Sequence, residues 1–264
     1  MRLNYIDNKD NVEGLRELPA DCIDLTVTSP PYDNIRNYNG FSWDAEKLIA
    51  ELYRVTKPGG VVVWIVNDAT VNGSETGTSF RQALAFKNAG FNIHDTMIWR
   101  KAGLSFPETT RYYPIFEYMF IFSKGRPKTV HLIEDRENKW KGTMVHGTDR
   151  QKDGSLIPTS SVKLKKARKV KPLGVRFNVW EMPEEKSNKT GHPAVFPLQL
   201  AQDHIVSWSS PGDVVLDPFM GSGTTAVAAV RTGRSYIGFE LSAEYYATAQ
   251  GRIAKEQEVE AWMY

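Results

Sequence analysis

Two short segments carry the residues whose types and spacing could do chemistry. The first is a loop that reads Asp217-Pro218-Phe219-Met220-Gly221-Ser222-Gly223-Thr224-Thr225. Its small residues would let a ligand approach the backbone, and a helix that begins there would offer free N–H groups. Glu240 ends the next expected strand, where a carboxylate can accept hydrogen bonds from a ribose. The pattern fits a nicotinamide cofactor or S-adenosylmethionine, with a purely structural turn as the third interpretation.

The second segment is the tetrapeptide Ser29-Pro30-Pro31-Tyr32, which directly follows an apolar run. Its plain interpretation is a surface turn with an incidental tyrosine. The Ser29 hydroxyl and a prolyl carbonyl, that of Pro30, can both accept hydrogen bonds from an exocyclic amine. Pro31 would hold the turn, and the Tyr32 ring could stack on a base that has left its helix. The segment therefore indicates a site for an amine carried by a nucleic-acid base.

Both segments must be positioned by the elements around them, and the pattern predicts strands that alternate with helices. We expect strands over 23–28, 60–66, 91–99, 115–122, 213–217 and 235–239. We expect helices over 44–56, 79–89, 197–208, 224–231 and 243–258. Pro58-Gly59-Gly60 should end the first helix, and 67–78 should form a loop. This alternation predicts an α/β fold with a doubly wound, mostly parallel sheet, which would bring both segments to the carboxyl ends of its strands.

The charge is unevenly distributed along the 264 residues, although the formal net charge is only +2. Lys124 to Arg176 contains 15 Lys/Arg and 5 Asp/Glu, a net of +10, so the rest of the chain carries −8. This stretch shows no sustained period and predicts a loop-rich insert with short strands at most. It is either a solvated charged loop or a surface that neutralises nucleic-acid phosphates. The candidate cations are Lys163, Lys165, Lys166, Arg168, Lys169, Lys171 and Arg176, together with Arg36, which follows the Ser29–Tyr32 tetrapeptide.

Several classes of protein are excluded or disfavoured. No apolar run approaches the roughly 18 residues of a membrane helix, and the N-terminus has no apolar signal core, so we expect no membrane association and no export. The single cysteine, Cys22, can form neither an internal disulfide nor a cysteine zinc site. No histidine–carboxylate cluster suggests another metal, so we expect none.

The order and content of these motifs resemble the β subgroup of the DNA amino-methyltransferases over nearly the whole chain. The resemblance rests on the catalytic motif at Ser29 to Tyr32, followed by the basic insert and then by the cofactor motif at Asp217 to Thr224. Glu240 matches the family's acidic ribose-binding residue, and Asp7 is a weaker match to an early aspartate that meets the adenine. A further match is the stretch His192-Pro193-Ala194-Val195-Phe196-Pro197. One departure is Phe116, which stands before Glu117 where members often carry histidine.

The resemblance implies a Rossmann-like methyltransferase fold with permuted motif order. A catalytic half would occupy 1–123, a target-recognition insert 124–178, and a cofactor-binding half 179–264. The cofactor-binding residues implied are Asp7, His192, Pro193, Phe196, Asp217, Pro218, Phe219, Gly221, Ser222, Gly223, Thr224 and Glu240. The family works in the cytoplasm of prokaryotic cells or is encoded by phages, on double-stranded DNA. Members are often dimers, and some are paired with a restriction endonuclease.

The implied reaction transfers a methyl group from S-adenosylmethionine to the exocyclic amine of a flipped base, without a covalent enzyme intermediate. Serine as the first residue of the catalytic motif goes mostly with N4 of cytosine in this family, so we place N6 of adenine second. A nicotinamide oxidoreductase would leave Ser29 to Tyr32 and the basic insert unexplained. A non-catalytic nucleic-acid-binding protein would leave the cofactor loop unexplained.

Overall fold

The computed structural model describes residues 1–32, 44–103, 109–144, 148–158, 169–184 and 196–262. These residues form two compact units. Unit 1 comprises Met1–His131 and Asn178–Tyr264, and unit 2 comprises Leu132–Phe177. The segment 124–131, which we expected to belong to the basic insert, lies in unit 1, where the Lys124 ammonium bonds the Asp21 carboxylate at 2.7 Å.

An eight-stranded sheet forms the centre of unit 1, in the order β1-β14-β13-β2-β3-β7-β6-β12. The strands are β1 (Tyr5–Asp7), β14 (Ser235–Phe239), β13 (Val214–Asp217), β2 (Ile23–Thr28), β3 (Thr56–Val66), β7 (Phe116–Ser123), β6 (Asn92–Lys101) and β12 (Val179–Met182). Among these described strands, β7 alone runs against its neighbours β3 and β6, while the other pairs are parallel.

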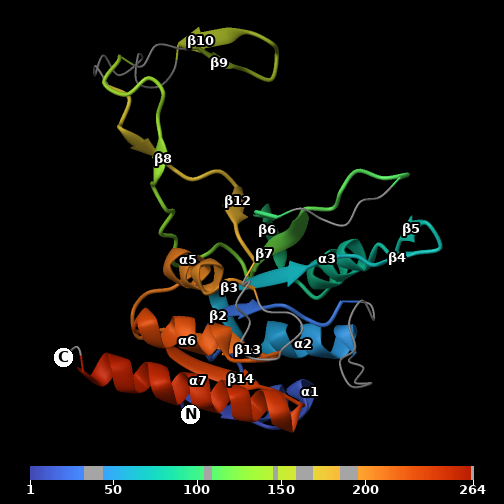
Figure 1. Ribbon diagram of the computed structural model, residues 1–264. Helices are drawn as coiled ribbons and strands as arrows, with labels where there is room; N and C mark the ends of the chain where they lie inside the picture. Colours follow the sequence, from blue (N-terminus) through green and yellow to red (C-terminus); the bar gives the residue numbers. More distant parts are fainter. Residues whose placement is uncertain (33–43, 104–108, 145–147, 159–168, 185–195, 263–264) are drawn as a thin grey trace. The chain divides into compact units, whose positions relative to one another are not determined.

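Helices cover both faces of this sheet. They are α1 (Asn11–Glu17), α2 (Ala45–Val55), α3 (Thr78–Asn88), α5 (Leu198–Trp208), α6 (Thr224–Arg231) and α7 (Ala243–Trp262). Successive residues of a strand point to opposite faces. In β3, Val63 and Ile65 therefore pack with α5, α6 and α7, whereas Val62 and Trp64 pack with α1, α2 and α3 (Figure 1). The predicted α/β fold with a doubly wound, mostly parallel sheet is confirmed.

The junction between α2 and β3 differs from our expectation. The Asp44 carboxylate caps α2 by accepting from the Lys47 amide at 3.1 Å, and the helix ends at Val55. β3 begins immediately at Thr56 and runs through Pro58-Gly59-Gly60, so these residues belong to the strand and do not form a separate stop signal. The physical reason is non-local pairing, because the Gly59 amide donates to the Lys124 carbonyl at 2.7 Å.

The remaining elements include several that the pattern missed. The expected loop 67–78 contains a short hairpin of β4 (Thr70–Val71) and β5 (Ser74–Glu75). β1, α1 and β12 were not predicted, and α7 extends beyond the expected end at 258 to Trp262. Among the described residues, no helix combines the length and apolar character needed to cross a membrane.

Unit 2 contains short antiparallel strand pairs, as expected for a loop-rich insert. β8 (Arg136–Glu137) pairs with β11 (Leu173–Gly174), and β9 (Thr148–Arg150) pairs with β10 (Leu156–Pro158). An isolated bridge joins Met144 to Lys169.

Candidate functional site

The two segments singled out in the sequence follow neighbouring strands at the centre of the sheet. The Thr28 hydroxyl at the end of β2 donates to Asp217 Oδ1 at the end of β13, at 2.6 Å. The Thr225 hydroxyl donates to the Val27 carbonyl at 3.1 Å. These two contacts hold the start of the Ser29–Tyr32 segment, the proline turn, against the Asp217–Thr225 segment, the glycine loop. The structure thus brings together two groups of residues that lie nearly 190 positions apart in the chain.

The backbone of the glycine loop is shaped by two residues with positive φ. Gly221 has φ +53° and Gly223 has φ +87°, a region that side chains with a Cβ rarely adopt. Gly223 directly precedes α6, so the turn delivers the first amide groups of that helix to the loop. A Cβ at Gly223 would also lie 3.1 Å from the Ala249 side chain of α7. Both conformation and space therefore require glycine at this position.

Glu240 ties the glycine loop to the end of β14. Its Oε2 accepts from the Gly221 amide at 2.7 Å, and its Oε1 accepts from the Ser242 amide at 2.8 Å. Burial raises the pKa of this carboxyl group, while the amide donors partly oppose the shift. β1 brings Asp7 to the same edge, because the Glu240 amide donates to the Asp7 carbonyl at 3.1 Å. The Asp7 carboxylate faces Lys9 and Arg2 at 3.7 Å and 3.6 Å.

Asp217 is the deepest carboxylate of the site. Burial raises its pKa to about 6, although hydrogen bonds from Thr28 and the Phe219 amide oppose the increase. The carboxylate form is therefore held in surroundings that favour the neutral form. A cationic group placed beside Asp217 would relieve that penalty.

The Tyr32 hydroxyl is held by several groups around the proline turn. It lies 2.8 Å from the Ser29 hydroxyl, 2.8 Å from Glu117 Oε2 and 3.3 Å from the Ile65 carbonyl. The Tyr32 ring packs against the core cluster on the α1–α3 side of the sheet. Pro30 is buried, and Ser29, Pro31 and Tyr32 are partly exposed. A side chain fixed in this way presents its ring in one orientation.

The structure adds residues that the sequence patterns did not indicate. Glu117 on β7 is only 6% exposed, and its Oε1 pairs with Lys101 Nζ at 2.7 Å. Lys101 at the end of β6 also pairs with Glu184 at 2.9 Å. Burial lowers the pKa of Lys101, but the two carboxylates outweigh this, so its pKa is raised overall. The only sequence signal was the match of Glu117 to the family's histidine–glutamate pair, and Lys101 carried none.

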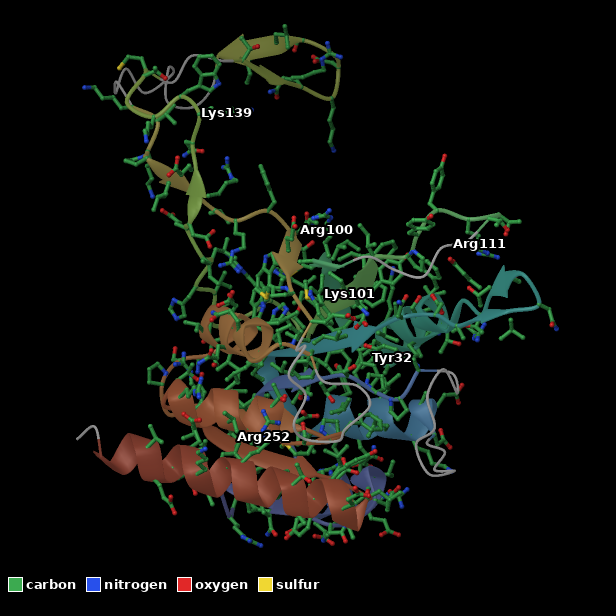
Figure 2. The ribbon with its side chains drawn as sticks, in the orientation of Figure 1. Tyr32, Arg100, Lys101, Arg111, Lys139 and Arg252 are labelled. Carbon is green, nitrogen blue, oxygen red and sulfur yellow. The ribbon has the colours of Figure 1, made fainter. Side chains whose placement is uncertain are left out.

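Arg252 on α7 (Figure 2) donates hydrogen bonds to the glycine loop. Its Nη1 donates to the Ser222 carbonyl at 2.6 Å and to the Ser222 hydroxyl at 2.8 Å. The same nitrogen lies 3.3 Å from the Thr224 hydroxyl. Arg252 follows the buried Ala249 by three residues, so helical spacing places it on the face toward the loop.

Other expected site residues divide into two groups. Arg36, His192, Pro193, Lys163, Lys165, Lys166 and Arg168 lie outside the described residues. Of the described ones, Phe196 packs against the core cluster on the α5–α7 side. In unit 2, Lys171 pairs with Glu134 at 3.1 Å, and the Arg176 guanidinium donates to Asp135 Oδ2 from Nε at 3.0 Å. These two cations are thus partly neutralised within their own unit. Among the described residues, no group of three or more His, Cys, Asp or Glu is arranged to hold a metal ion.

Comparison with known proteins identifies the family. The N6_N4_Mtase family, described as DNA methylase, matches residues 23–251. The chain is 56% identical over 248 residues to the orphan methyltransferase M.BamHII of Bacillus amyloliquefaciens, covering 90% of this chain and 92% of that protein. It is 26% identical over 257 residues to the DNA adenine methyltransferase YhdJ of Escherichia coli K12, covering 92% of this chain and 80% of that protein.

A solved structure shows the same fold. The putative DNA modification methylase TTHA0409 of Thermus thermophilus, in complex with S-adenosyl-L-methionine, superposes with a TM-score of 0.64 at 27% identity. The match covers 96% of this chain and 94% of that one. The family and the Rossmann-like methyltransferase fold predicted from the ordered motifs are confirmed. The chain belongs to the DNA methylase family.

Proposed function

We propose that this DNA methyltransferase transfers a methyl group from S-adenosylmethionine to the exocyclic amine of a flipped base, N4 of cytosine before N6 of adenine. The observation that carries the proposal is the 2.6 Å hydrogen bond between Thr28 and Asp217, which sets the proline turn beside the glycine loop. An amine at the turn and a methyl donor at the loop would then meet without a large rearrangement.

The residues of the glycine loop fit S-adenosylmethionine. Asp217 is a buried carboxylate whose raised pKa makes it a favourable neighbour for a cation. Glu240 is a partly buried acceptor suited to ribose hydroxyl groups. Gly221 and Gly223 leave the backbone open, with the first turn of α6 behind them. The bound cofactor supplies an electrophilic methyl group on a sulfonium, and the chain supplies the acceptors that orient the amine.

At the proline turn, the Ser29 hydroxyl and the Pro30 carbonyl accept the hydrogens of the target amine. This directs the nitrogen lone pair away from ring conjugation and toward the methyl group. Tyr32 stacks on the extruded base, which helps to offset the few kcal/mol that unstacking costs. Asp7 and Phe196 complete the cofactor side by resemblance, together with His192 and Pro193.

Serine at position 29 favours cytosine in this family, but the physical argument does not separate the two amines, since a hydroxyl can accept from either. The likeness to YhdJ supports adenine as the second candidate. The experiment is incubation with labelled S-adenosylmethionine and unmethylated genomic DNA, followed by digestion to nucleosides. Label in N4-methylcytosine supports the first candidate, and label in N6-methyladenine supports the second. Absence of label from DNAs of many sequences, with a protein that binds the cofactor, would overturn both.

Unit 2 is the proposed contact with double-stranded DNA. Leu132–Phe177 contains 12 Lys/Arg against 5 Asp/Glu, a net of +7. Trp140, with a 73% exposed side chain, sits between Lys139 and Lys141. In the described part of unit 2, neither of these lysines forms an ion pair, so both are available to phosphates. Dimer formation and pairing with a restriction endonuclease stay predictions of the resemblance.

A further inference from the structure

A chain of hydrogen bonds and ion pairs leads from the end of β6 to the proline turn. Lys101 Nζ contacts Glu117 Oε1 at 2.7 Å, Glu117 Oε2 contacts the Tyr32 hydroxyl at 2.8 Å, and that hydroxyl contacts Ser29 Oγ at 2.8 Å. Lys101 is the last residue of β6, and Tyr32 lies in the turn that follows β2 (Figure 2). Every link is short enough to be a well-formed hydrogen bond.

The direction of each bond in this chain follows from the chemistry of its groups. Glu117 is a buried carboxylate that forms an ion pair with the Lys101 ammonium through Oε1 at 2.7 Å. An ionised carboxylate can only accept, so the Tyr32 hydroxyl must donate its proton to Glu117. The Ile65 carbonyl competes for that proton, but it is neutral and lies farther away, at 3.3 Å.

The last bond in the chain is therefore fixed as well. With its proton committed to Glu117, the Tyr32 oxygen can act only as an acceptor toward Ser29. The Ser29 hydroxyl then donates to Tyr32 and keeps lone pairs on Oγ for another donor. Those lone pairs are what the N–H groups of a target amine require.

We propose that Glu117 is a positioning residue that fixes the direction of the Ser29–Tyr32 hydrogen bond, so that Ser29 faces the substrate amine as an acceptor. Lys101 maintains this direction by donating to Glu117 Oε1, which leaves Oε2 to accept from Tyr32. The inference rests on the proposed function, because it assigns Ser29 its acceptor role in that reaction. It differs from a stacking role for Tyr32, since here the Tyr32 hydroxyl carries the effect.

Glu117→Gln tests the direction with little change of shape. The amide can donate to the Tyr32 oxygen, which frees the Tyr32 proton to point at Ser29 and occupy its lone pair. We expect the single-turnover rate of methyl transfer to fall by about 10- to 100-fold. The dissociation constant for S-adenosylmethionine should change less than about twofold, because Glu117 makes no described contact with the cofactor loop. A merely structural role for Glu117 would instead lower the rate of methyl transfer and weaken the binding of S-adenosylmethionine together.

A double-mutant cycle with Tyr32→Phe separates this mechanism from a general disturbance. Phenylalanine removes the hydroxyl that relays the effect, so adding Glu117→Gln to Tyr32→Phe should change the rate by less than about twofold. The matched control is Glu181→Gln, which removes the carboxylate paired with Arg100 between β12 and β6 and should leave the rate unchanged.

When all variants fold, three outcomes overturn the proposal: a full rate in Glu117→Gln, independent multiplicative losses in the double variant, or an equal loss in Glu181→Gln. A wild-type protein that transfers no methyl group contradicts the proposed function itself. Thermal unfolding of each variant identifies any that fails to fold. In that event Lys101→Met, which leaves Glu117 and Tyr32 in place, should still lower the rate with cofactor binding intact, and an unchanged rate overturns the proposal.

Discussion

Replacing Asp217 with asparagine should stabilise the protein at neutral pH and remove part of the pH dependence of its unfolding. Burial raises the pKa of Asp217 from 3.8 to about 6 in the folded chain. In the unfolded chain the carboxyl group ionises near its ordinary pKa. The folding stability that the protonated Asp217 carboxyl group contributes is therefore fully present below the unfolded pKa. It is lost as the pH rises through about 6. Asparagine keeps an oxygen that can accept from Thr28 and the Phe219 amide, but it does not ionise.

The magnitude follows from the two pKa values of Asp217. Their difference, from 3.8 to about 6, corresponds to roughly 3 kcal/mol of folding free energy at pH 7.5. Roughly 1.6 kcal/mol of that penalty is already present at pH 5, because the unfolded carboxyl group is largely ionised there. The wild-type protein should therefore lose about 1.4 kcal/mol of stability relative to Asp217→Asn between pH 5 and pH 7.5.

Urea unfolding of both proteins at several pH values in this range measures the difference directly. Glu244→Gln, which removes an exposed carboxylate on α7, is the control and should follow the wild type. Any part of the difference in unfolding free energy between wild type and Asp217→Asn that does not vary with pH comes from the amide group and not from ionisation. A free-energy difference that stays constant from pH 5 to pH 7.5 would refute the reasoning, because it would mean that Asp217 ionises alike in the folded and unfolded chains.

Three further predictions concern the cofactor loop and unit 2. Glu240→Gln should weaken S-adenosylmethionine binding by about tenfold or more, because it replaces a charged acceptor with a neutral one. Unchanged binding in equilibrium dialysis would exclude the ribose contact. Gly238→Ala should lower the free energy of unfolding by about 1–3 kcal/mol, because its Cβ would overlap the Met220 methyl group; an unchanged urea midpoint would contradict this. Replacing Lys139 and Lys141 with glutamine should reduce the slope of log DNA affinity against log salt concentration by about 0.9 per lost phosphate contact. An unchanged slope would mean that DNA does not contact these two lysines.

Local patterns were sufficient to predict the central strands and the two loops at their ends. The proline turn and the glycine loop each depend on residues adjacent in sequence, and parallel strand order brings their positions together. The part of β3 that runs through Pro58-Gly59-Gly60 could not be predicted in this way, because its backbone is paired with residues near Lys124. β1 was missed for the same reason, since three residues become a strand only by pairing with β14.

The site itself shows the same division. Ser29, Asp217 and Glu240 stand in recognisable motifs, so their placement at the ends of neighbouring strands could be predicted from residue type and spacing. The link from Glu117 to Tyr32 joins residues 85 positions apart. Neither residue has a neighbour that signals the contact, and only the antiparallel placement of β7 beside β3 brings them together.

The hydrogen bond between Thr28 and Asp217 also has a consequence for synthesis of the protein. The two residues are separated by 189 positions, so β2 emerges from the ribosome long before its partner β13 exists. At about 5–20 residues per second, roughly 10–40 s pass between the translation of these two strands. During that interval the edge of β2 that pairs with β13 in the folded protein lacks this partner strand. Completion of the proposed catalytic centre must therefore wait for the last fifth of the chain, where β13 is translated.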